Sequence, residues 1–272
     1  MTSEDILKRN NVTIFGQGPK TLLFAHGFGC DQNMWRFVTP AFADDYRLVL
    51  FDYVGAGKSD HAAYSADRYS SLQGYAQDVL DICAALELTE AILVGHSVSG
   101  MIGLLASLHE PSHFSDLIMV SPSPCYLNDP PDYFGGFERA EVEGLLDLMD
   151  RNDLGWASFL APTVMQNPDQ PELTVEMEQS FCATDPKIMR RFAETTFFSD
   201  NRADLASVTL PSLILQCTGD VIAPPFVGDF LHRHLPGSVL TVIEASGHCP
   251  HMSHPQETVQ AIKNYLSSAL LQ

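Results

Sequence analysis

The stretch 92-ILVGHSVSG-100 places a serine among small residues directly after an apolar run. Such a run is typical of a buried strand, and residues 95–99 (GHSVS) almost match the pattern G-x-S-x-G, with Ser99 in the last place and Gly100 following. In that pattern a sharp strand-to-helix turn presents the serine hydroxyl at the N-terminus of a helix. An ordinary turn between a strand and a helix would leave the same signal, so the surrounding sequence has to decide between a structural turn and a nucleophile.

The rest of the chain alternates short apolar runs with helical patterns. The apolar runs predict strands at residues 20–27, 46–52, 90–95, 114–122, 210–220 and 238–251. Helical spacing of apolar residues predicts helices at residues 71–88, 99–110 and about 255–270. Continuous Val/Ile/Leu strands between helices indicate an α/β fold, with a mostly parallel central sheet and helices on both faces.

This alternation stops after Pro122. Residues 121–137 (SPSPCYLNDPPDYFGGF) are rich in proline and glycine and suit a linker, and residues 138–199 show only helical patterns. We therefore expect residues 1–123 and 200–272 to form two parts of one α/β core. Residues 124–199 are expected to form a helical lid inserted between them.

Composition excludes several classes of protein. The chain has 272 residues, of which 45% are hydrophobic and 18% charged, so it can bury a large core. Its formal net charge of −19 disfavours nucleic acid and anionic membranes as partners. No apolar run is long enough for a membrane span or a secretory signal, and the six cysteines lack C-x-x-C spacing. We expect a cytoplasmic protein with free thiols.

Two later segments supply the partners that a serine nucleophile needs. Asp220 ends the apolar run LILQCTGD, and His248 follows the next one, LTVIEASGH. The order serine, acid, histidine suits a catalytic triad on a parallel sheet, whose strands present their carboxyl ends at one edge. We predict Ser97 as nucleophile, His248 as base and Asp220 as the acid that orients it. The backbone amides of Val98 and Phe28 are predicted to form the oxyanion hole.

Two other patterns suggest different chemistry. Residues 55–59 (GAGKS) resemble the end of a phosphate-binding loop, but Asp52 occupies the place of the first glycine, so we interpret this segment as a structural turn. A spacing of three could suggest a metal site at His248, His251 and His254. Pro250 and Pro255 interrupt any shared helical face, and no cysteine or carboxylate pattern supports zinc geometry. We expect neither a metal nor a cofactor.

The predicted insertion is rich in aromatic residues: Tyr133, Phe134, Phe137, Trp156, Phe159, Phe181, Phe197 and Phe198. We expect part of this set to form the core of the insertion itself. The remainder is expected to line an apolar pocket over Ser97 that excludes water and selects a lipophilic ligand. His96, beside the predicted nucleophile, is interpreted as a packed structural residue.

Several stretches resemble the α/β-hydrolase fold and, more narrowly, the bacterial stress-response regulator RsbQ and the plant strigolactone and karrikin receptors. They include FAHGFGCDQNMW, VGHSVSGMIG, SPSPCYLNDPPDYFGGFE, LILQCTGDVIAP and GHCPHMSHP. RsbQ usually has glycine where Ser99 stands, whereas the plant receptors often have serine. The resemblance implies the same triad and oxyanion hole as above and a lid of four helices in a V. It further implies lid or pocket roles for Phe134, Trp156, Phe159 and Phe197.

The resemblance also implies a function. RsbQ-like proteins are thought to process a small apolar ligand and to act with a PAS-containing phosphatase, and the plant relatives hydrolyse a butenolide slowly and change their affinity for partners. One hypothesis is thus a serine hydrolase that cleaves an ester or lactone of a small hydrophobic molecule through an acyl-enzyme, in a stress-signalling context. The other is a ligand receptor with incidental hydrolysis that binds a signalling partner. Serine at position 97 argues against haloalkane dehalogenases and epoxide hydrolases, which use aspartate there.

Overall fold

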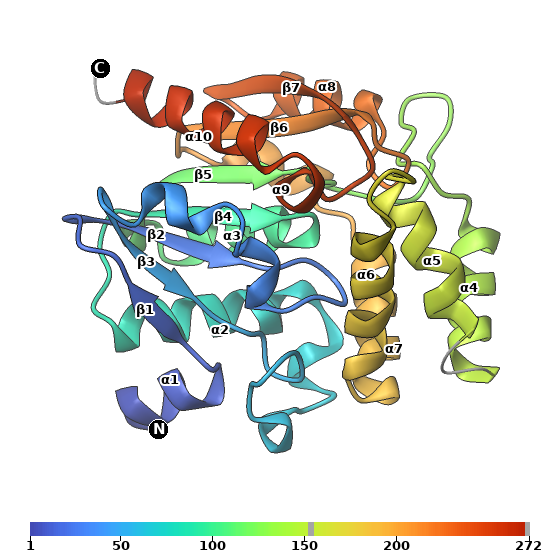
Figure 1. Cartoon of the computed structure of the whole chain (residues 1–272), viewed down its shortest axis with the longest axis horizontal. Coiled ribbons are helices and arrows are strands. Elements are labelled where there is room, and N and C mark those ends of the chain that lie inside the picture. Colours follow the sequence, from blue (N-terminus) through green and yellow to red (C-terminus); the bar gives the residue numbers. More distant parts are fainter. Residues whose placement is uncertain (152–154, 270–272) are drawn as a thin grey trace.

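The computed structural model describes residues 1–151 and 155–269 (Figure 1). Within them, seven strands form one sheet in the order β1-β3-β2-β4-β5-β6-β7. Every neighbouring pair is parallel except β1 and β3. The strands are β1 (Thr13–Phe15), β2 (Lys20–Ala25), β3 (Tyr46–Leu50), β4 (Ala91–His96), β5 (Phe114–Val120), β6 (Ser212–Gly219) and β7 (Ser238–Ser246).

The helices follow the predicted alternation and add several that no pattern indicated. They are α1 (Ser3–Arg9), α2 (Leu72–Ala85), α3 (Val98–His109), α4 (Arg139–Arg151), α5 (Gly155–Met165), α6 (Pro171–Ala183), α7 (Pro186–Phe197), α8 (Pro225–His234), α9 (Pro250–Ser253) and α10 (Pro255–Ala269). Leu270, where the last helix was predicted to end, lies outside the described residues. No helix in the part of the chain that the structure describes combines the length and apolar character that crossing a membrane requires.

Strand β2 shows why the sheet is covered on both faces. Its residues Leu22 and Phe24 belong to one buried cluster, which includes side chains of α10. The alternate residues Leu23 and Ala25 belong to a second cluster, together with side chains of α2, α3 and α8. Because successive side chains of a strand point to opposite faces, a strand that is apolar at every position needs cover on both sides. The prediction of a mostly parallel sheet between two layers of helices is confirmed.

The first strand was not predicted. Thr13, Ile14 and Phe15 are all exposed, so β1 carries neither a buried run nor an alternation of apolar and polar residues. It joins the sheet by antiparallel pairing with β3 at the edge. This edge strand depends on backbone pairing, which leaves no mark in the sequence pattern.

Between β5 and β6 the chain leaves the sheet and forms α4, α5, α6 and α7. We call these four the insertion helices. They stand together beside the sheet, with α4 packed on α7 and α5 packed on α6 (Figure 1). The prediction of helices without strands over this segment matches the described residues from 139 to 197.

Candidate active site

The turn between β4 and α3 has the strained geometry that the opening motif requires. Ser97 lies between the two elements with φ 56° and ψ −125°, a conformation that a residue with a side chain rarely adopts. The turn is so tight that a Cβ atom on Gly95 would lie 2.4 Å from the backbone oxygen of Ser99. Only glycine fits at position 95, and the Ser97 hydroxyl is consequently presented at the N-terminus of α3.

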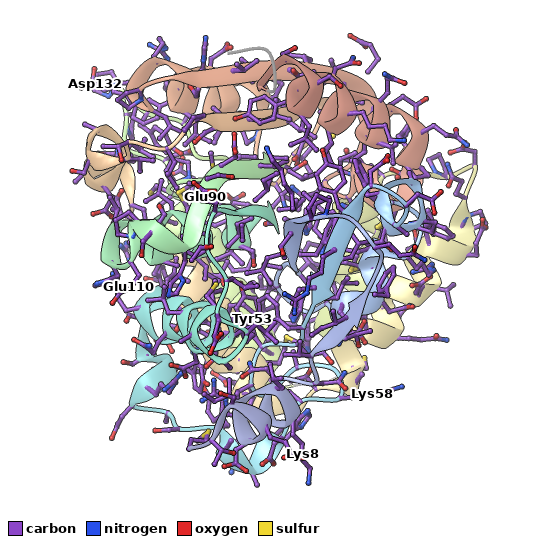
Figure 2. All side chains as sticks on the ribbon, turned by 90° about the vertical axis from the view of Figure 1, so that its left-hand side faces the viewer. Lys8, Tyr53, Lys58, Glu90, Glu110 and Asp132 are labelled. Atoms are coloured by element: carbon purple, nitrogen blue, oxygen red, sulfur yellow. The ribbon has the colours of Figure 1, made fainter. Side chains whose placement is uncertain are left out.

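Ser99, the departure from the usual motif, has its own hydrogen bonds. Its hydroxyl is fully buried and donates to the backbone oxygen of His26. Because that bond uses the only hydroxyl proton, the Tyr53 hydroxyl at 2.9 Å donates to Ser99 Oγ. Tyr53 lies among the interior side chains in Figure 2, whereas Lys8 and Lys58 lie at the periphery. A serine therefore takes the place of the glycine without leaving a polar group unpaired.

Three side chains from distant segments form a hydrogen-bonded line. His248 Nε2 lies 2.7 Å from Ser97 Oγ, and His248 Nδ1 lies 2.7 Å from Asp220 Oδ2. The other carboxylate oxygen, Asp220 Oδ1, accepts hydrogen bonds from the backbone amides of Ile222 at 2.8 Å and Ala223 at 3.0 Å. All three members of the line are buried. The structure thus brings together the three side chains that the sequence selected.

The main chain at His248 is held from two sides. Its amide donates to the backbone oxygen of Val164 in α5 at 2.8 Å, and its carbonyl lies 2.9 Å from His96 Nε2. The preceding residue, Gly247, has φ 84°, and a Cβ there would meet the backbone oxygen of Met165 at 2.0 Å. His96 is therefore a structural support, as predicted, and the base is positioned by α5 as well as by the sheet.

The predicted oxyanion donors lie beside Ser97. Val98 is the first residue of α3, and Phe28 follows β2 and lines the same cavity as Ser97. A hydrogen bond connects the loop that carries Phe28 to α6: Ser180 Oγ donates to the backbone oxygen of Gly29 at 2.7 Å. Four aromatic rings surround the ring of Phe28 at centroid distances of 5.6 to 6.4 Å: Trp156, Phe181, Phe192 and Phe197.

A small cavity lies over Ser97, between the sheet edge and the insertion helices. We call its sheet-edge side the cavity floor, formed by Phe28, Cys30, His96, Ser97, Tyr126, Ile222, His248 and Cys249. We call its opposite side the cavity roof, formed by Leu160 and Val164 of α5, Met177 and Phe181 of α6, and Thr196 and Phe197 of α7. The roof is almost entirely apolar, which suits a small lipophilic ligand.

One of the four predicted pocket aromatics lines this cavity, and a second lies directly behind its wall. Phe197 is part of the roof. Trp156 is buried behind it, with its ring 5.1 Å from that of Phe181 and 6.4 Å from that of Phe28. Trp156 therefore supports two cavity walls without being one of the lining residues.

The prediction is wrong for the other two aromatics. Phe159 is 66% exposed and faces an outer apolar groove between α4 and α5. Its neighbour Leu160 and the residue one turn later, Val164, take the inward face of α5, so Phe159 points away. Phe134 is 46% exposed and packs against Phe226 of α8, away from Ser97.

Sequence reasoning missed Tyr126. Its hydroxyl lies 3.0 Å from Ser97 Oγ, and both residues are buried. Tyr126 falls in the proline-rich segment at the start of the predicted lid, where no catalytic role was predicted. The one available signal was its position shortly after β5, at the sheet edge where Ser97 was expected.

The segment 55–59 forms a turn, as predicted. The Lys58 amide donates to Asp52 Oδ2 at 2.9 Å, and the Gly55 amide donates to Ser59 Oγ at 3.0 Å. Asp52, the residue that breaks the phosphate-loop pattern, closes this turn.

Among the residues that the structure describes, a buried cluster behind His248 is the group most able to hold a metal. His96, Cys249 and His251 each have one ligand atom within 4.8 Å of the others. Burial lowers the pKa of His251 to about 3 and raises the pKa of the Cys249 thiol well above its usual value. A metal would have to remove the thiol proton and displace the bond from His96 to His248. We interpret the cluster as packing, and the absence of a metal stays a prediction.

Comparisons with known proteins agree with this fold. Residues 22–261 match the model of the alpha/beta hydrolase family, and the chain belongs to that family. It is 38% identical over 258 residues to the karrikin insensitive 2 receptor CA of Petunia hybrida, with 94% of this chain and 95% of that protein covered. It is 36% identical to the strigolactone esterase D14 of Arabidopsis thaliana, covering 98% and 99% of the two chains. The solved structure of olei00960, a hydrolase from Oleispira antarctica, superposes with a TM-score of 0.96 at 47% identity over 98% of both chains.

Proposed function

We propose that the protein is a serine hydrolase that cleaves an ester or lactone of a small hydrophobic molecule through an acyl-enzyme. The observation that carries the proposal is the hydrogen-bonded line from Ser97 through His248 to Asp220, facing an apolar cavity. A serine hydroxyl is a weak nucleophile at neutral pH, and this line supplies the base that activates it.

In the first half of the reaction, Ser97 Oγ attacks the carbonyl carbon while its proton moves to His248 Nε2. Asp220 stabilises the resulting imidazolium and holds the ring in the tautomer with Nδ1–H. The amides of Val98 and Phe28 are proposed to bind the oxyanion of the tetrahedral intermediate. The imidazolium then gives its proton to the departing alcohol, and the acyl group remains on Ser97.

In the second half, water attacks the acyl carbonyl carbon and gives a proton to His248 Nε2. The bond between the acyl carbon and Ser97 Oγ breaks, and Oγ takes the proton back from the imidazolium. The acid product leaves and the free serine is restored. Each step uses side chains and amides of this chain together with water.

The cavity indicates the substrate class. Its roof is proposed to act as part of a lid formed by residues 124–199, which keeps water away from the reacting carbonyl and binds apolar groups. The apolar side chains around Ser97 suit an ester or lactone of a small hydrophobic molecule. Similarity to relatives named as esterases supports the same class.

A second candidate function is that of a ligand receptor whose hydrolysis is slow. It is favoured by the 38% identity to a protein named as a karrikin receptor. In this version the ligand occupies the same cavity, and the output is binding of a signalling protein, such as a PAS-containing phosphatase in a stress response. The site chemistry is common to both candidates, and the rate of turnover separates them.

The test is hydrolysis of p-nitrophenyl esters by the wild type and by Ser97→Ala. Ser107→Ala is the matched control, since Ser107 lies on α3, the helix that follows Ser97, and its hydroxyl donates to the backbone oxygen of Leu104. Rapid multiple turnover that Ser97→Ala abolishes supports the enzyme. One slow stoichiometric burst, with a ligand-induced rise in melting temperature, supports the receptor. Unchanged cleavage by Ser97→Ala contradicts the proposed mechanism.

A further inference from the structure

Tyr126 contacts the atom that the proposed function makes the nucleophile. Its hydroxyl oxygen lies 3.0 Å from Ser97 Oγ, on the floor of the cavity. Both side chains are buried, Ser97 at 5% exposure and Tyr126 at 1%. The contact joins a segment beyond β5 to the turn after β4, so it is a product of the tertiary fold.

The direction of this hydrogen bond follows from the other contacts of the line. A carboxylate only accepts hydrogen bonds, so His248 Nδ1 carries the proton that points to Asp220. The neutral ring then offers a lone pair at Nε2, and the single proton of Ser97 points to it at 2.7 Å. With that proton used, Ser97 Oγ can only accept from Tyr126. The Tyr126 hydroxyl is the donor.

The position of Tyr126 is well defined by its surroundings. The Phe137 amide donates to the Tyr126 backbone oxygen at 3.1 Å, and the Asn201 amide donates to the backbone oxygen of Pro124 at 2.7 Å. Its ring packs edge-on against Phe197, with centroids 5.3 Å apart. Burial raises the pKa of Tyr126 above its usual value, so the hydroxyl keeps its proton.

We propose that Tyr126 is a further catalytic residue, which stabilises Ser97 Oγ as the leaving group when the acyl-enzyme breaks down. The inference rests on the proposed role of Ser97 as nucleophile. In deacylation, water adds to the acyl carbon, and the bond from that carbon to Oγ then breaks with its electron pair staying on Oγ. The Tyr126 O–H donates to Oγ while this charge develops, and the proton that neutralises it comes from His248. Tyr126 keeps its own proton throughout.

The two halves of the reaction are affected unequally. During acylation the Tyr126 hydrogen bond is already present in the free enzyme, and Oγ donates electrons to the carbonyl, so the bond contributes little. During deacylation Oγ gains negative charge, and a hydrogen bond to a charged oxygen is stronger than one to a neutral oxygen. Loss of the donor is therefore expected to slow deacylation by about tenfold, the effect of one hydrogen bond, and acylation by less than about threefold.

The experiment compares Tyr126→Phe with the wild type, using a p-nitrophenyl ester. Release of p-nitrophenolate in the first turnover measures acylation, and intact-protein mass spectrometry measures the decay of the acyl-enzyme. Tyr75→Phe is the matched control, because Tyr75 is also a buried tyrosine and its hydroxyl has no hydrogen-bond partner among the described residues. We expect a longer-lived acyl-enzyme in Tyr126→Phe and unchanged rates in Tyr75→Phe.

Other outcomes overturn the inference. If the acyl-enzyme of Tyr126→Phe decays at the wild-type rate, or if acylation falls as much as deacylation, Tyr126 has no selective role at the leaving Oγ. Rates are counted per acylated enzyme, so a lower folded fraction does not affect them. Should Tyr126→Phe fail to fold, Tyr126→Leu also lacks the donor and is judged by the same ratio of rates. Failure of the proposed function gives a different result, an absence of any acyl-enzyme on Ser97 in the wild type.

Discussion

The floor and the roof of the cavity are held in place by different kinds of interaction. On the floor, hydrogen bonds at 2.7 Å link Ser97, His248 and Asp220, and backbone amides fix the carboxylate. On the roof, side chains such as Phe181 and Phe197 are positioned by contacts with other rings, among them that of Phe28. Hydrogen bonds require a defined distance and angle between donor and acceptor. Apolar packing tolerates substitution when the side-chain volume is kept. The floor is thus suited to chemistry and the roof to selecting the ligand.

The two regions are also physically connected. The Val164 backbone oxygen of α5 accepts from the His248 amide, and Ser180 of α6 donates to the Gly29 backbone oxygen in the loop that carries Phe28. A displacement of either helix would therefore reach the base or one predicted oxyanion donor. Substitutions in the two regions can separate direct effects on chemistry from effects transmitted by these contacts.

The largest effect is expected on the floor, from Asp220→Asn. An amide at this position would place an N–H₂ group where His248 Nδ1–H or the amides of Ile222 and Ala223 now donate, and the histidine would lose its catalytic tautomer. We expect turnover of p-nitrophenyl esters to fall by about 10³ to 10⁴-fold. The measurement is kcat, with circular dichroism to show that the fold is kept. A loss below tenfold would mean that Asp220 does not orient the base.

On the roof, Phe197→Ala is expected to act on binding and stability. Truncation of this buried ring leaves a cavity and should lower the free energy of unfolding by about 3 kcal/mol. The KM for an apolar ester should rise more than kcat falls, since the residue contacts the ligand space and not the reacting atoms. Urea unfolding and steady-state kinetics measure the two effects. Phe159→Ala, in the exposed position, is the control and should change stability by less than about 0.5 kcal/mol.

The buried histidines behind the floor should make stability depend on pH. Burial depresses the pKa of His96 well below its usual value and that of His251 to about 3. Below about pH 6.5 both imidazoles take up a proton in the unfolded chain but stay neutral in the folded protein. The free energy of unfolding is therefore greatest above that pH and decreases as the pH falls. Each histidine contributes about 1.4 kcal/mol per pH unit, or about 2 kcal/mol between pH 6.5 and 5.

Urea unfolding at several pH values tests this dependence. His251→Phe keeps an aromatic ring against Trp35, whose ring centroid lies 4.6 Å from that of His251. Because the variant lacks one of the two buried histidines, its unfolding takes up one proton fewer. Its free energy of unfolding should fall less steeply than that of the wild type below pH 6.5. Parallel curves would show that His251 takes up no proton on unfolding.

The smallest effect is expected from Ser180→Ala, which removes a link between roof and floor. Loss of the hydrogen bond to Gly29 should lower stability by about 1 kcal/mol. If the link positions the Phe28 amide, kcat should fall by about threefold, a change smaller than loss of an oxyanion donor itself. Ser158→Ala is the control, since the exposed Ser158 also donates from an insertion helix but pairs with Glu178 of α6 and not with the loop that carries Phe28. Equal kcat values in both variants would show that the link is purely structural.

Much of the sheet and of the hydrogen-bonded line could be predicted because the signals are local. Buried parallel strands carry continuous apolar runs, such as residues 22–25 in β2 and residues 91–94 in β4, and the turn at Ser97 demands small neighbours. The chain order of Ser97, Asp220 and His248 then selects three loops at one sheet edge. Strand β1 gave no such signal, because its residues are exposed and only pairing with β3 defines it.

The roof could not be predicted residue by residue. Aromatic composition marked the insertion as a source of pocket residues, but which face of α5 turns inward depends on how α5 packs against α6 and the sheet edge. That packing turned Phe159 outward and Leu160 inward. It also left Trp156 one layer behind the cavity wall.

The amino-acid sequence by itself determined the parallel α/β core, the elbow at Ser97 and the identity of its two partners, because backbone sterics and strand burial act over a few neighbouring residues. Only the tertiary structure decided that Tyr126 reaches Ser97 Oγ, that α5 supports His248, and that Phe159 stays outside. These contacts join segments far apart in the chain, and their geometry depends on the packing of whole elements, which no local pattern encodes.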